Sequence, residues 1–121
     1  MLLVDANVIL RLLLCDNTEM TKQAVKVISE HKITLRYEVI AEIVYVLQKI
    51  YRLPREEISA ALTHVVSLEN VETEHVDVLS EAFNVFAKRN LDFVDCLLYA
   101  FNAVKGDSVF SFDKKLNTLL Y

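Results

Sequence analysis

Met1-Leu2-Leu3-Val4-Asp5-Ala6-Asn7-Val8-Ile9-Leu10 is the stretch that decides the expected fold. Apolar residues lead straight to the carboxylate Asp5 and the amide Asn7, and apolar residues then return. The pattern predicts a short buried strand followed by a helix, with Asp5 where the strand ends. Asp and Asn are also preferred helix N-caps, so a second reading is that both residues only satisfy free N–H groups of that helix.

The composition fits a single folded domain over residues 1–121. A chain of this length buries roughly two-thirds of its unfolded surface, and 54% of its residues are hydrophobic. No segment reaches the roughly 18 apolar residues of a membrane helix, and the N-terminal stretch lacks the basic leader of a signal peptide. We therefore expect a cytoplasmic protein without a membrane partner, with reduced, core-facing thiols at Cys15 and Cys96.

Glycine content and charge exclude several classes of function. Gly106 is the single glycine, so neither a GxGxxG dinucleotide loop nor a Walker loop can form. The net charge of −4 argues against tight, sequence-independent binding to long nucleic acid, which draws on many phosphate contacts. The three histidines lack the spacing of a zinc site.

Hydrophobic periodicity predicts strands that alternate with helices along the whole chain. After the first strand and its helix, the expected strands are 33–35, 71–73 and 108–112, and the expected helices are 16–31, 39–50, 54–65, 78–89, 92–104 and 114–119. Alternation of this kind implies a parallel sheet covered by helices on both faces. The sequence therefore predicts an α/β fold.

Four carboxylates lie at comparable junctions of this pattern. Asp5 ends the first strand and Asp113 ends the fourth, so both are expected at the carboxyl edge of the sheet, where open α/β sheets bind ligands. Glu42 belongs to the helix after the second strand, and Asp95 to the first turn of the helix before the fourth. Four acids in one place repel unless a cation shares them. Oxygen-only ligands favour Mg²⁺ or Mn²⁺.

Capping offers another explanation for several of these acids. Asp92 and Asp95 have the spacing of an N-cap and a first-turn acid, and Ser111 precedes Asp113 in a similar arrangement. Glu42 could be an exposed charge on its helix. Capping alone, however, explains neither Glu42 in an apolar helix nor the coincidence of the strand ends.

Four motifs in this order resemble those of PIN-domain nucleases. They are Val4-Asp5-Ala6-Asn7-Val8-Ile9-Leu10, Ala41-Glu42-Ile43, Leu91-Asp92-Phe93-Val94-Asp95-Cys96-Leu97 and Val109-Phe110-Ser111-Phe112-Asp113-Lys114-Lys115-Leu116. The resemblance implies a single PIN domain over 1–121, a three-layer α/β/α sandwich whose central parallel sheet has four strands, or five. The compact length resembles the VapC-type toxins of bacterial or archaeal toxin–antitoxin systems.

The resemblance also implies a function. It is that of a metal-dependent endoribonuclease, a hydrolase that cuts single-stranded or structured RNA, with Mg²⁺ or Mn²⁺ held by Asp5, Glu42, Asp95 and Asp113. Asn7, Asp92 and Ser111 match supporting positions. A metal-activated water would attack the phosphodiester and leave 5′-phosphate ends. An antitoxin protein and a homodimer, formed through the second or third helix, are the expected partners.

Positive charges that could meet substrate phosphates are scattered along the chain. They are Arg11, Arg36, Lys88, Arg89, Lys114 and Lys115. Arg36 departs from the family pattern, because relatives often carry a small hydroxyl residue there. The chain also stops soon after the fourth motif, which leaves little room for a final strand.

Two other functions fit the same acids. One is a different metal-dependent phosphohydrolase, although a haloacid-dehalogenase-type enzyme needs a second aspartate where Asn7 stands. The other is a PIN-like RNA-binding or dimerisation module that has no catalytic activity. Metal-dependent cleavage of RNA would separate the nuclease from both.

Overall fold

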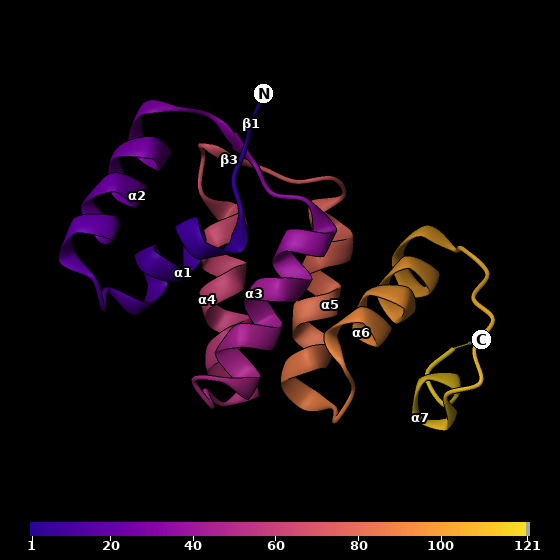
Figure 1. The fold of residues 1–121 in the computed structure, drawn as a ribbon. Helices are drawn as coiled ribbons and strands as arrows, with labels where there is room; N and C mark the ends of the chain where they lie inside the picture. Colours follow the sequence, from indigo (N-terminus) through magenta and orange to yellow (C-terminus); the bar gives the residue numbers. More distant parts are fainter. Residues whose placement is uncertain (121) are drawn as a thin grey trace.

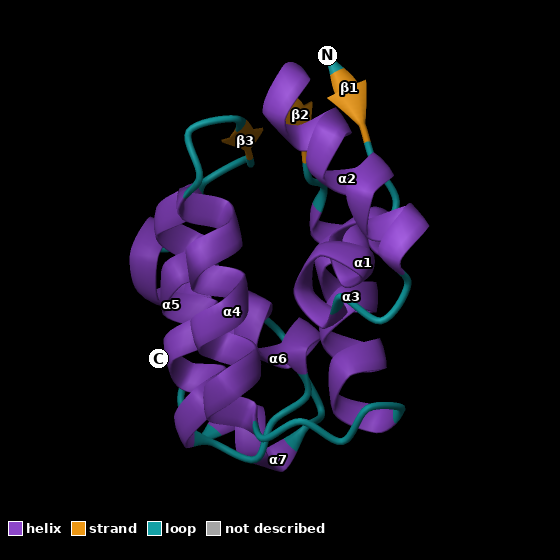
Figure 2. Ribbon diagram, turned by 90° about the vertical axis from the view of Figure 1, so that its left-hand side faces the viewer, coloured by secondary structure: helices purple, strands orange, loops and turns teal. Residues whose placement is uncertain are grey.

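The computed structural model describes residues 1–120 and shows an α/β fold with a small parallel sheet (Figures 1 and 2). The strands are β1 (Leu2–Leu3), β2 (Ile33–Thr34) and β3 (Val71–Glu72), in the order β1-β2-β3. The helices in this part of the chain are α1 (Ala6–Leu14), α2 (Thr18–Glu30), α3 (Tyr37–Lys49), α4 (Arg55–Ser67), α5 (Val76–Lys88), α6 (Phe93–Ala100) and α7 (Lys114–Asn117), with a π-helical stretch, η1 (Phe101–Lys105), after α6.

The helices form where periodicity and capping residues predict them. The Asn17 side chain accepts a hydrogen bond from the Met20 amide at 3.0 Å and starts α2, as an N-cap should. In α3, Ile40, Ile43 and Leu47 are fully buried, and this spacing puts them on one helical face. The predicted helix 39–50 is therefore confirmed, with its start two residues earlier in the structure.

Aromatic packing joins α5 to α6. Phe83 and Phe93 stack with ring centroids 5.5 Å apart, and Phe86 meets Phe93 edge-on at 6.0 Å. Because buried aromatic side chains contribute large apolar areas, these contacts fix the position of α6 relative to α5. The α5–α6 turn, residues 89–92, thus has a rigid support on both sides.

The number of strands differs from the prediction. The α/β class and the parallel pairing are confirmed, but residues 1–120 form three strands rather than four or five. The expected strand 108–112 is irregular, and its Phe110 and Phe112 are 85% and 90% exposed. A strand needs a neighbour to satisfy its backbone groups, and among the described residues β1 pairs only with β2. The three-layer sandwich stays a prediction.

Two further expectations have different outcomes. Cys96 is buried as predicted, whereas Cys15 is exposed; the prediction for Cys15 was wrong because this residue leaves α1 in the left-handed conformation, with φ 51°. The helix expected over 92–104 is divided into α6 and η1, and Gly106 ends it with φ 77°. None of the helices in residues 1–120 is long and apolar enough to cross a membrane.

Candidate functional site

An acidic pocket of about 360 Å³ lies where the α5–α6 turn and α6 meet the start of α7. Its lining contains three carboxylates and two lysines. The residues that form it are Asn90, Leu91, Asp92, Asp95, Asp113, Lys114 and Lys115. Residues from the third and fourth sequence motifs, about twenty positions apart, therefore share one hollow of the surface.

Helix ends position the carboxylates of the acidic pocket. Asp92 is the N-cap residue of α6, and its carbonyl accepts a hydrogen bond from the Cys96 amide at 3.0 Å. Asp95 lies in the first turn of the same helix. The Asp113 side chain caps α7 by accepting from the Leu116 amide at 2.8 Å. Both helices thus begin at the pocket and present acids where N-terminal dipoles favour them.

Ser111 supports Asp113. Its hydroxyl oxygen accepts a hydrogen bond from the Asp113 amide at 2.9 Å, and its carbonyl accepts one from the Asn117 side chain at 2.9 Å. These two bonds connect the segment before α7 to the helix itself. They hold the backbone of Asp113 in place, although residues 108–112 form no strand.

The electrostatics of the acidic pocket act on Asp95. Burial raises the pKa of Asp95 above its usual 3.8, and the charges of Asp113 and Asp92 raise it further. The ionised form of Asp95 is therefore disfavoured, because the pocket removes water and adds like charge. A bound cation would reverse this effect.

The acidic pocket fits a divalent cation in its chemistry but does not hold a closed set of ligands. Its carboxylates are the hard oxygen donors that Mg²⁺ and Mn²⁺ prefer. Within residues 1–120, however, no three Asp, Glu, His or Cys side chains lie close enough together to hold one metal ion. The acids are thus near enough to repel one another, while coordination would require their side chains to move closer.

Asp5 and Glu42 lie outside the acidic pocket. Asp5 is exposed and caps α1, accepting from the Val8 amide at 3.3 Å, so the capping explanation for Asp5 agrees with the structure. Glu42 is exposed on α3. Figures 1 and 2 show α1 and α7 on different sides of the molecule. The predicted roles of Asp5 and Glu42 in metal binding stay predictions.

Asn7 lines a different, smaller pocket. This second hollow, about 160 Å³, lies between α1 and α2 and also includes Arg11. Arg11 forms an ion pair with Asp16 there. The predicted supporting role of Asn7 at the metal site therefore has no contact in residues 1–120 that connects it to the acidic pocket.

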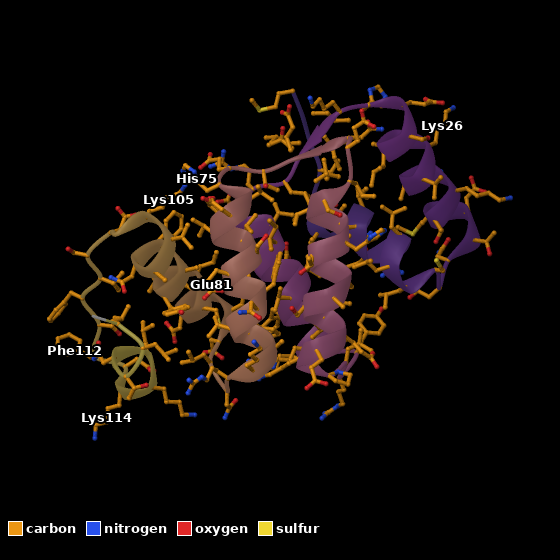
Figure 3. All side chains as sticks on the ribbon, turned by 180° about the vertical axis from the view of Figure 1, so that it is seen from behind. Lys26, His75, Glu81, Lys105, Phe112 and Lys114 are labelled. Carbon is orange, nitrogen blue, oxygen red and sulfur yellow. The ribbon has the colours of Figure 1, made fainter. Side chains whose placement is uncertain are left out.

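Two of the six candidate cations line the acidic pocket. They are Lys114 and Lys115, and the Lys115 ammonium lies 3.5 Å from the Asn90 carbonyl oxygen. Arg36, by contrast, forms an ion pair with Glu38. In Figure 3, Phe112 and Lys114 lie at the outer edge of the molecule, away from the body made by α4 and α5. Positive charge at the pocket thus comes from the start of α7.

Sequence reasoning missed the α5–α6 turn and its support. Asn90 lines the acidic pocket beside Leu91, the first residue of the third motif, and an asparagine carries no signal for such a position. Arg55 holds this turn through hydrogen bonds to its carbonyls. Arg55 did carry a signal, because a basic residue at a helix N-terminus opposes the helix dipole.

The parallel sheet, the surrounding helices and the acidic pocket at two helix N-termini define an α/β domain with a carboxylate site. The family model described as PIN domain matches residues 2–119, so the chain belongs to the PIN-domain family. PIN domains are generally nucleases and typically use divalent metals. No curated protein and no solved structure matches the chain.

Proposed function

We propose that this PIN domain is a metal-dependent endoribonuclease that hydrolyses phosphodiester bonds of single-stranded RNA. The observation that carries the proposal is the acidic pocket, where burial and two neighbouring acids raise the pKa of Asp95. Acids gathered in one hollow, one of them with a raised pKa, are a reason to propose a functional site there. Membership of the PIN family supports nuclease activity at that site, because PIN domains are generally nucleases.

Asp92, Asp95 and Asp113 are the residues proposed to hold Mg²⁺ or Mn²⁺. A divalent ion bound by carboxylates supplies an activated water and offsets negative charge on the attacked phosphate. Ser111 orients Asp113 through its backbone amide. Asp5 and Glu42 complete the set that the family motifs suggest, and their contribution requires approach to the pocket from α1 and α3.

Lys114 and Lys115 are proposed to attract the substrate phosphates. Both line the acidic pocket, and lysines beside a group of acids provide the local positive charge that a chain with net charge −4 lacks overall. Attack by water rather than by the ribose 2′-hydroxyl would leave 5′-phosphate and 3′-hydroxyl ends. The end chemistry of the products therefore reports the mechanism.

A toxin role in a toxin–antitoxin pair is the biological setting that we propose, with action in the cytoplasm. The antitoxin would cover the acidic pocket, and an arginine from it could pair with the carboxylates. A homodimer through α2 or α3 is also proposed, supported by exposed apolar side chains: Val25 on α2 is 50% exposed and Tyr45 on α3 is 60% exposed.

Cleavage of RNA tests the proposal directly. An unstructured RNA is incubated with the wild-type chain and Mn²⁺, with and without chelator, and with the variants Asp95→Asn and Asp107→Asn. Asp107 is exposed and is not part of the acidic pocket, so its variant controls for the loss of one negative charge. We expect chelator and Asp95→Asn to abolish cleavage and Asp107→Asn to keep it. Cleavage that survives chelation or Asp95→Asn would contradict the mechanism.

One observation favours a second candidate, an RNA-binding PIN module without catalytic activity. No three metal-binding side chains come together in the described residues. The same experiment separates the two functions, because the second predicts RNA binding in a gel-shift assay without cleavage at any Mn²⁺ concentration. Turnover of a small phosphate ester without RNA cleavage would instead indicate a different phosphohydrolase.

A further inference from the structure

The Arg55 guanidinium makes an unusual set of contacts across two helices. Its Nη1 donates hydrogen bonds to the carbonyl oxygens of Phe86 at 3.1 Å, Arg89 at 2.7 Å and Leu91 at 2.8 Å. Its Nη2 donates to the Asn90 side-chain oxygen at 3.4 Å. The guanidinium carbon also lies 4.4 Å from the centroid of the Phe86 ring. One side chain from α4 thus binds nearly every residue of the α5–α6 turn.

These contacts satisfy backbone carbonyls at the end of α5 and in the turn, and among the described residues only the Leu91 carbonyl of this set has a further side-chain donor, the Cys96 thiol at 3.8 Å. The last carbonyls of α5 and those of the turn have no intrahelical donor. A cation is favourable at a helix C-terminus, where Arg55 meets α5, and unfavourable at a helix N-terminus, where Arg55 sits in α4. Arg55 is half-buried. Its hydrogen bonds to the turn, rather than its place in α4, therefore explain why a cation is stable at this position.

The turn that Arg55 holds forms one wall of the acidic pocket. Asn90 and Leu91 line that pocket, and Asp92 follows directly as its first acid. The Cys96 amide then donates to the Asp92 carbonyl at 3.0 Å, which connects the turn to the first turn of α6. A shift of the turn would therefore move Asp92 and, through α6, Asp95.

We propose that Arg55 is a positioning residue for the metal site. From α4 it holds the α5–α6 turn, which carries one wall of the acidic pocket. This inference rests on the proposed function, because it assigns Arg55 a supporting role at the same pocket. Groups that orient metal ligands typically change metal affinity or activity by about 10- to 100-fold when removed. In the described residues Arg55 forms hydrogen bonds to the turn and none to the three carboxylates that line the acidic pocket, so its effect must pass through the backbone of the turn.

Ser59 supplies a matched control. It lies about one turn further along α4, and its buried hydroxyl donates to the Phe83 carbonyl of α5 at 2.8 Å. Ser59→Ala therefore removes a buried bond between the same two helices without touching the α5–α6 turn. A loss of stability alone would appear in both variants.

The test measures Mn²⁺ affinity by calorimetry on the full chain, at a temperature where every variant is folded by circular dichroism. Arg55→Met keeps the aliphatic stem and removes the donors, and we expect its Mn²⁺ Kd to rise about 10-fold or more. Arg55→Lys keeps the charge but is shorter and not planar, so we expect an intermediate Kd. Ser59→Ala should keep the wild-type Kd within about twofold, since it leaves the turn intact.

A second readout requires no metal. Hydrogen exchange in chelator, followed at the Cys96 amide, should be faster in Arg55→Met than in the wild type and in Ser59→Ala, once each is referred to its global stability. Exchange that rises equally in both variants would show a general loosening and would overturn the positioning role.

The outcomes separate the two proposals. An unchanged Kd in Arg55→Met, or an equal rise in Ser59→Ala, overturns the role of Arg55 and leaves the nuclease proposal standing. If Arg55→Met does not fold, Arg55→Lys decides: a weaker Kd than in Ser59→Ala supports the role, and an equal one overturns it. Wild-type protein that binds no Mn²⁺ contradicts the proposed function, and exchange at Cys96 then decides alone whether Arg55 holds the turn.

Discussion

Asp5 and Asp113 do the same local work in different surroundings. Each side chain caps a helix by accepting from the amide three residues ahead, at 3.3 Å in α1 and 2.8 Å in α7. Asp113, however, shares a pocket with two other acids and helps to raise the pKa of Asp95. Both side chains are exposed, but Asp5 does not line that pocket.

The comparison teaches that capping does not exclude a role in metal binding. A capping carboxylate uses one oxygen for the helix amide and keeps other lone pairs free. Asp113 differs from Asp5 because two further acids line the same pocket. Several carboxylates close together favour the binding of a divalent ion, since the ion offsets their repulsion. Substituting Asn for Asp tests this difference cleanly, because Asn is an equally good N-cap that carries no charge.

Within the comparison of the two capping acids, the largest effect is expected for Asp113→Asn. Loss of a ligand should cost more than loss of an outer partner, so we expect RNA cleavage to fall by more than about 100-fold. The cap survives, so the melting temperature should change little. Initial cleavage rates and circular dichroism melts check both parts. Wild-type activity in this variant would remove Asp113 from the site.

A smaller loss is expected for the acids outside the pocket. Asp5→Asn and Glu42→Gln should each reduce cleavage by about 10- to 100-fold if these residues reach the ion only when RNA and metal are bound. In kinetics over a range of Mn²⁺ concentrations, the loss will appear as a higher Mn²⁺ concentration at half-maximal activity. Full activity in Asp5→Asn would mean that Asp5 is a cap alone, as it is in the free chain.

Ser111→Ala should have a modest effect. The variant removes the hydroxyl that accepts from the Asp113 amide, while the charge of the pocket stays the same. Because one neutral hydrogen bond contributes roughly 1 kcal/mol, we expect a decrease in cleavage of about fivefold. Ser108→Ala is the control, because Ser108 lies in the same segment and makes no hydrogen bond to Asp113 among the described residues; this variant should cleave like the wild type.

The smallest expected effect is a gain in stability in Asp95→Asn, whereas the variants above lose activity. The raised pKa of Asp95 means that the folded chain binds more protons than the unfolded chain between the two pKa values, so stability falls as pH rises through this window. At pH 7 in chelator, Asp95→Asn should therefore melt at a higher temperature than the wild type. The difference should disappear below the unfolded pKa of about 4. A lower melting temperature at pH 7 would contradict the repulsion in the pocket.

The sequence was sufficient to predict most helices because their signals are local. Periodic apolar residues such as Ile40, Ile43 and Leu47, and an N-cap such as Asn17, act within a few positions. The third and fourth motifs likewise came together, since Asp95 and Asp113 share the acidic pocket. That Asp5 and Glu42 lie outside this pocket could not be predicted from the sequence, because their placement depends on how the sheet is assembled.

Non-local contacts account for the remaining differences. Residues 108–112 have strand-forming side chains, but a strand requires a neighbour, and β1 pairs only with β2 among the described residues. Arg55 reaches carbonyls 31 to 36 positions away, which no periodicity reveals. Both features depend on tertiary packing that overrides or extends the local pattern.

Mn²⁺ binding by calorimetry tests the central claim most directly. The wild-type chain should show saturable binding, and Asp95→Asn should weaken it by more than about 100-fold while Asp107→Asn leaves it unchanged. No saturable binding in the wild type, or equal binding in Asp95→Asn, would contradict the assignment of the acidic pocket as the metal site.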